Sequence, residues 1–115
     1  MGWGERPALI IIDVCKAYWQ EGSPLDLSNN EEAKAAPEVM RELVAAARKG
    51  GCPVIHSQVL YTAPNMADAG LFWRKSKVLD VWHRDDQRGL AEPLPGLAPE
   101  GQYCIRSRNV ALLSL

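Results

Sequence analysis

The chain has 115 residues, of which 47% are apolar, and its net charge is −1 from 13 basic and 14 acidic side chains. This length suits one small domain, and the apolar content is enough for a packed core. With no basic block and no long apolar run, the composition argues against nucleic-acid binding, membrane binding, a transmembrane helix and a secretory signal.

The few cysteines and histidines are scattered along the chain. Cys15, Cys52 and Cys104 form neither a CxxC pair nor a disulfide ladder, which favours free thiols in a reducing, cytoplasmic compartment. His56 and His83 are too few and too far apart for a recognisable metal site. We therefore expect a cytoplasmic protein with neither metal nor cofactor.

The first predicted element is a strand over Ala8–Ile12, a run of five apolar residues. Because the run does not alternate with polar residues, we expect both of its faces to be covered, as in a parallel sheet. Asp13 follows this run and places a charge at the carboxyl end of a buried strand.

A helix and a second strand follow. Asn29 or Asn30 can cap a helix that runs to about Lys49, and Pro37 marks either a kink in it or its true first turn. Residues 53–57 read as a second buried strand. Strand, helix and strand in this order predict a right-handed βαβ unit with a parallel pair.

The remainder is divided by prolines and glycines. A short element is expected over Ser76–Trp82, and the Pro/Gly cluster at 93–101 is expected to be a loop that returns the chain to the sheet. A third strand is predicted over Gln102–Ile105, and the first turns of a helix over Val110–Leu115. Such a half-sheet would normally continue with further strands.

Three stretches of the chain, taken in order, resemble the isochorismatase-like cysteine hydrolase superfamily. The opening from Gly2 to Asp13 is most similar to N-carbamoylsarcosine amidohydrolase-like proteins, Ala46–His56 resembles the helix and second strand of the wider superfamily, and Asp68–Lys75 resembles the next loop of the amidohydrolase branch. The resemblance implies a three-layer α/β/α, Rossmann-like parallel sheet. Residues 1–115 would be a partial domain, truncated to about the first three strands.

The resemblance also implies a reaction. Members hydrolyse C–N bonds, or a vinyl ether in isochorismatase itself, with a carboxylate, a lysine and a cysteine in that chain order. Asp13 matches the carboxylate, and Arg106 stands where the lysine is expected. Arginine keeps the positive charge but presents a larger planar group that does not release a proton near neutral pH. The cysteine should begin a helix after a fourth strand, and the chain is expected to end before it.

Each of these residues also has a simpler interpretation. Asp13 could be an ordinary loop carboxylate, and Arg106 a surface cation at a strand end. Buried cysteines are usually structural, so none of Cys15, Cys52 and Cys104 is expected to replace the nucleophile. The nicotinamidase branch carries an Asp-x-His motif after the second strand, and the residues here, His56 to Val59, disfavour that metal-dependent activity.

Trp73 and Lys75 are further candidates, for contact with a small amide substrate. The aromatic Trp73 could equally pack under a loop or in a subunit interface. Two functions stay open. One is a cysteine amidohydrolase acting on a small carbamoyl or amide compound. The other is a non-catalytic, truncated remnant that pairs with a longer relative. The apolar first strand has no charge or proline to protect a free edge, so we expect a homo-oligomer or association through that edge.

Overall fold

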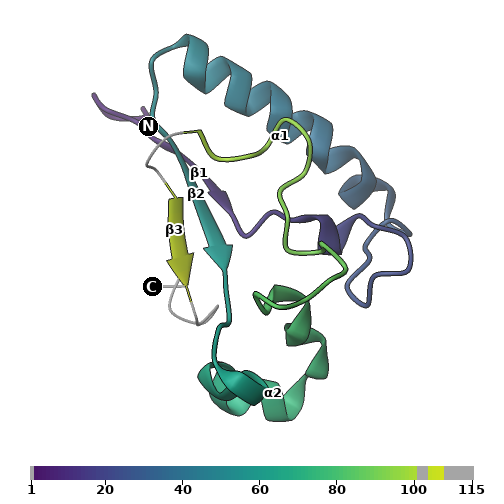
Figure 1. The fold of residues 1–115 in the computed structure, drawn as a ribbon. Coiled ribbons are helices and arrows are strands. Elements are labelled where there is room, and N and C mark those ends of the chain that lie inside the picture. Colours follow the sequence, from purple (N-terminus) through teal and green to yellow (C-terminus); the bar gives the residue numbers. More distant parts are fainter. Residues whose placement is uncertain (1, 101–103, 108–115) are drawn as a thin grey trace.

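The fold is built on a small parallel β-sheet (Figure 1). The computed structural model describes residues 2–100 and the backbone of residues 104–107. The strands β1 (Leu9–Ile12), β2 (Val54–Val59) and β3 (Cys104–Ser107) lie in the order β1-β2-β3, and both pairs are parallel. The predicted α/β class with a parallel sheet is therefore confirmed.

The strand bounds differ slightly from those predicted. β1 begins one residue later than expected, and β2 continues two residues further, to Val59. β3 begins at Cys104, and the predicted start at Gln102 lies outside the described residues. Since all three strands are parallel, their carboxyl ends meet at one edge of the sheet. The predicted helix over Val110–Leu115 also lies outside the described residues.

The long helix α1 (Glu31–Lys49) connects β1 to β2. Asn30 caps it, because its side-chain oxygen accepts a hydrogen bond from the backbone N–H of Ala33 at 3.0 Å. Pro37 lies inside the helix and not in its first turn. A proline cannot donate to the carbonyl four residues earlier, which here is that of Ala33. The indole Nε1 of Trp19 donates to this carbonyl at 2.7 Å, so the lost helical bond is replaced by a tertiary one.

Short helices fill the connection between β2 and β3. These are η2 (Pro64–Ala69), α2 (Gly70–Lys75) and η3 (Lys77–Trp82). A further helical turn, η1 (Lys16–Tyr18), lies between β1 and α1. The segment η3 confirms the short element predicted over Ser76–Trp82. Residues 93–100 form no helix or strand, as predicted for the return loop. No helix in the described part of the chain is long and apolar enough to span a membrane.

The two faces of β1 are in different environments. Ile11 is only 6% exposed, and it packs with Val44 of α1 and Val54 of β2. Ile10 and Ile12 point to the other face and are 55% and 59% exposed. The prediction that both faces of this strand are covered is thus wrong for the described residues. An apolar run identifies a strand, but it does not say whether a second layer is present to cover it.

A second cluster of buried side chains lies beyond the carboxyl end of the sheet. It includes Tyr61, Val81 and Trp82, together with Cys15 and Ala17. Backbone hydrogen bonds hold it, since Tyr61 N–H donates to the Trp82 carbonyl at 3.0 Å and Ala17 N–H donates to the Leu90 carbonyl at 2.8 Å. This cluster packs the segment after β2 against the segment after β1.

Candidate active site

Asp13 lies at the carboxyl end of β1, where the chain leaves the sheet. Its backbone N–H donates to the hydroxyl of Ser57 at 3.1 Å, and that hydroxyl donates to Asp13 Oδ1 at 2.6 Å. The same N–H also approaches the Ser57 carbonyl at 3.2 Å. Ser57 is 5% exposed, so these bonds are shielded from competing water. The reciprocal contact fixes both the backbone and the carboxylate of Asp13.

The backbone of Asp13 adopts a conformation that is uncommon for a residue with a side chain, with φ of 52°. Such backbone strain is tolerated where surrounding bonds hold it, and it is found more often at functional sites than elsewhere. With Oδ1 bound to Ser57, Oδ2 receives no hydrogen bond from the described residues. Asp13 is only partly buried. The carboxylate therefore keeps one oxygen available to accept a proton.

Arg106 lies at the same edge of the sheet as Asp13. Ile12 pairs with Ser57 in the register of β1 and β2, so the next residue, Asp13, is level with Gln58. Gln58 is in turn the register partner of Arg106 in β3. The backbone thus brings the two predicted positions to one level of the sheet, with β2 between them. The side chain of Arg106 is outside the described residues.

Cys15 is near Asp13 in sequence but is unsuited to attack a substrate. It is 4% exposed, and Trp82 Nε1 donates to its sulfur at 3.5 Å. Burial is the main cause that raises the pKa of the Cys15 thiol, and the nearby Asp13 carboxylate acts in the same direction. Cys52 precedes β2 at the opposite end of the sheet, with its sulfur 3.2 Å from the Pro7 carbonyl. Both are free thiols.

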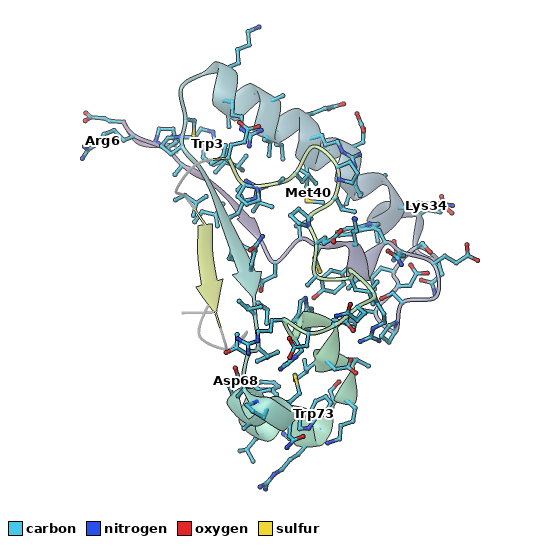
Figure 2. The ribbon with its side chains drawn as sticks, in the orientation of Figure 1. Trp3, Arg6, Lys34, Met40, Asp68 and Trp73 are labelled. Carbon is cyan, nitrogen blue, oxygen red and sulfur yellow. The ribbon has the colours of Figure 1, made fainter. Side chains whose placement is uncertain are left out.

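The structure separates Trp73 and Lys75 from Asp13. Both belong to α2, at the far end of the molecule (Figure 2). Trp73 is half-buried against the cluster around Tyr61, and Lys77 Nζ lies 4.3 Å from its ring centroid. Lys75 is exposed. The hollows that Trp73 lines have no described residue in common with the hollows that Asp13 lines.

Two neighbouring hollows lie at the carboxyl edge of the sheet. Asp13 and Ser57 line a narrow crevice, and beside it a groove of about 420 Å³ lies between the end of β2 and residues 81–93. Four residues line both hollows: Gln58, Val59, Trp82 and Ala91. The volume of the groove is within the range of small-molecule sites.

Sequence reasoning did not identify Ser57 or Gln58 as candidates for this site. The available signal was two polar side chains near the end of a buried strand, which lies beside the strand that Asp13 follows. Both positions become relevant only once the register places them next to Asp13.

The histidines have structural environments. His83 Nε2 lies 3.1 Å from the Ala63 carbonyl, which can only accept, so this nitrogen carries the proton. His83 Nδ1 then accepts from the backbone N–H of Asp85 at 3.2 Å. His56 is buried on the face of the sheet that α1 covers. Within the described residues, no three His, Cys, Asp or Glu side chains are grouped to hold a metal ion.

Comparison with known sequences gives one informative similarity. No family model matches the chain. Over 113 residues the chain is 33% identical to maleamate amidohydrolase from Pseudomonas putida. The match includes 96% of this chain and 50% of that enzyme, so the chain spans about half the length of its curated relative.

Two solved structures share the fold. An isochorismatase family protein from Desulfovibrio vulgaris superposes with a TM-score of 0.64 at 25% identity, over 88% of this chain and 52% of that protein. A cysteine hydrolase from Pseudomonas syringae pv. phaseolicola superposes with a TM-score of 0.66 at 21% identity, over 86% and 44%. At 21% identity, the similarity to the cysteine hydrolase shows a shared fold alone.

Proposed function

We propose that this chain, which belongs to the isochorismatase-like hydrolase superfamily, carries the carboxylate part of an amidohydrolase site. The observation that supports this most directly is the geometry of Asp13, which is strained, held by Ser57 through one oxygen and open at the other. Strained backbone positions are found more often at functional sites than elsewhere. The 33% identity to maleamate amidohydrolase supports the reaction class.

In this proposal Asp13 is the general base. Its carboxylate takes the proton from a cysteine thiol, the thiolate adds to the carbonyl carbon of the amide, and the carboxyl group then returns the proton to the leaving nitrogen. Water afterwards hydrolyses the thioester and releases the acid. Arg106, level with Asp13 across β2, would supply the positive charge that stabilises the thiolate and the developing oxyanion.

The nucleophile in this proposal is a cysteine other than Cys15 and Cys52. The first is buried with a raised pKa, and the second lies at the opposite end of the sheet. Cys104 lies within the strand β3 and not at the start of a helix. We therefore propose that residues 1–115 by themselves do not hydrolyse an amide. The cytoplasm is the proposed compartment, since free thiols suit a reducing environment.

The experiment starts with the native product. Its intact mass, measured after purification from the source organism, shows whether it extends beyond Leu115. The 115-residue chain and the native product are then assayed with maleamate, N-carbamoylsarcosine and neutral amides, with and without prior alkylation of thiols. The 115-residue chain should release no ammonia above background. A native product that contains the further cysteine should hydrolyse an amide until it is alkylated.

The role of Asp13 is tested in the active species. Asp13→Asn keeps the size of the side chain but removes its basicity, and kcat should fall by about a hundredfold or more. Asp26→Asn is the matched control, because Asp26 only accepts a hydrogen bond from Ser28 N–H within its own loop. Alkylation-sensitive turnover that survives Asp13→Asn would sink the assignment of the base. Turnover by the 115-residue chain that is lost in Cys15→Ser would sink the proposal about the nucleophile.

A second candidate function follows from the open side of β1. In the described residues β1 pairs only with β2, and Ile10 and Ile12 are exposed on the uncovered face. A chain with this surface could act as a non-catalytic partner of a longer relative or of its own copies. A monodisperse monomer with a sharp cooperative unfolding transition would rule out association with its own copies.

A further inference from the structure

The short helix α2 has an apolar surface that no step of the proposed mechanism uses. Trp73 packs inward against the cluster around Tyr61, which leaves the other side chains of α2 in solvent. Leu71 is 70% exposed and Phe72 is 47% exposed, although both are large and apolar. Adjacent exposed apolar side chains with polar residues around them are typical of a surface that binds another molecule.

Two cations lie beside these apolar side chains. Arg74 and Lys75 follow Leu71 by three and four residues, so they lie on the same side of the helix as Leu71. Both are exposed, and neither forms an ion pair within the described residues. We call Leu71, Phe72, Arg74 and Lys75 the α2 patch.

The outer side of α1 has a surface of opposite charge. Val39 and Leu43 are four residues apart, lie next to each other on the helix and are 54% and 51% exposed. Glu32 lies two turns before Val39, and Glu42 lies one turn after it, so both are on this side. Both carboxylates are exposed and form no ion pair within the part of the chain that the structure describes. We call these four residues the α1 patch.

The two patches match in composition but are kept apart within one chain. Each has two large apolar side chains and two charges without a partner, and the charges of one patch are opposite to those of the other. The helix α2 lies at the end of the molecule opposite α1 (Figure 1). The patches can therefore meet only when two copies of the chain come together.

We propose that the α2 patch of one chain docks on the α1 patch of a second copy. The apolar side chains of the two patches pack against each other, and the basic pair faces the acidic pair. Because two different surfaces meet, the contact is heterologous, and a dimer formed in this way keeps one patch of each kind free for further copies. The contact uses neither β1 nor the hollows beside Asp13, so it is independent of the proposed function.

The size of the patches sets the strength of this contact. A helix of six residues on the side of another helix buries less surface than a standard protein interface, and contacts of that size are weak and transient. The four charges remain near solvent, where salt screens them. The association should therefore grow with protein concentration and weaken as the salt concentration rises.

The apolar part of the contact is tested by sedimentation velocity on the 115-residue chain, over a range of concentrations at low salt. Phe72→Ala should raise the dissociation constant about tenfold, because truncation of an aromatic side chain at an interface commonly has an effect of this size. Trp3→Ala is the matched control. Trp3 is 91% exposed and belongs to neither patch, so its truncation should leave the dissociation constant unchanged.

The charged part is tested by reversal and mixing. Glu42→Lys and Lys75→Glu should each weaken association by a factor of about three to ten, because an attraction becomes a repulsion. An equal mixture of the two variants should associate more strongly than either alone, since the first keeps an intact α2 patch and the second an intact α1 patch. Glu21→Lys and Arg6→Glu make the same charge changes at exposed positions outside both patches, and each should behave as the unchanged chain does.

Four outcomes overturn the inference. They are a chain that stays monomeric at every concentration, unchanged association in Phe72→Ala, a mixture no more associated than its components, and an equal loss of association in the charge controls. Association that persists in all of these variants but is lost in Ile10→Lys would assign the contact to β1, and this too overturns the inference.

Discussion

On one face of β1 Ile11 is almost completely buried under α1, whereas on the other face its neighbours Ile10 and Ile12 are more than half exposed. The three residues are identical in type and adjacent in sequence. What differs is the presence of a packed helix, which removes one face from water and leaves the other in contact with it. Burial in this sheet is thus decided by which elements cover it.

The largest expected difference between the faces is in stability. Ile11→Ala removes a buried side chain from the contact with Val44 and leaves a cavity, which should cost about 2–5 kcal/mol in the free energy of unfolding. Ile12→Ala removes a side chain that is mostly in water and should cost less than about 1 kcal/mol. Urea unfolding followed by circular dichroism measures both. Equal losses would show that the second face is covered in solution.

A smaller effect is expected where α1 is attached to the segment after β1. Trp19→Phe removes the donor to the Ala33 carbonyl and should lower the free energy of unfolding by about 1–3 kcal/mol. Pro37→Ala provides a backbone N–H for the same carbonyl, so the loss caused by Trp19→Phe should shrink in that background. A double-mutant cycle from four unfolding curves checks this coupling. Strict additivity would contradict the replacement of the lost bond by Trp19.

His56, on the face of the sheet that α1 covers, should make the free energy of unfolding depend on pH. Burial of His56, and then the charge of Arg48, lower the pKa of its imidazole below the ordinary 6.5, while Glu100 acts in the opposite direction. Below pH 6.5 the unfolded chain therefore binds more protons than the folded one. Stability should be full above pH 6.5 and decline as the pH falls through the folded pKa.

Urea midpoints measured in steps from pH 8 to pH 5 check this dependence. In His56→Gln the urea midpoint should fall less as the pH is lowered. In His83→Gln the fall of the midpoint that His56 causes should remain. A decline that is unchanged in His56→Gln would assign the effect to another group.

The smallest effect on stability, but a clear effect on association, is expected on the open face. Ile10→Lys and Ile12→Lys place charges where the side chains already contact water, so the free energy of unfolding should change by no more than about 0.5 kcal/mol. The same charges should reduce self-association through the open edge and face of β1. Light scattering after size-exclusion chromatography measures the mass of the associated species. Lys49→Ala, on the exposed end of α1, should leave that mass unchanged.

Much of the local structure could be predicted from sequence patterns. The apolar runs predicted β1 and β2, Asn30 and the two glycines after Lys49 bounded α1, and the position of Asp13 after an apolar strand marked it as a candidate. These features depend on interactions between near neighbours in the chain, which is why a single sequence contains them.

Other features were decided only by the tertiary structure. Asp13 and Ser57 are 44 residues apart in the sequence, so their reciprocal hydrogen bonds could not be predicted from it. The tolerance of Pro37 inside α1 is explained only by the hydrogen bond from Trp19 to the Ala33 carbonyl. Trp73 matched a family loop in sequence, yet the fold carries it away from Asp13. Sequence therefore determined which segments become strands and helices and where a carboxylate follows a strand. The register and packing of those segments, which bring distant residues together, decided which side chains share a site and which face of the sheet stays open.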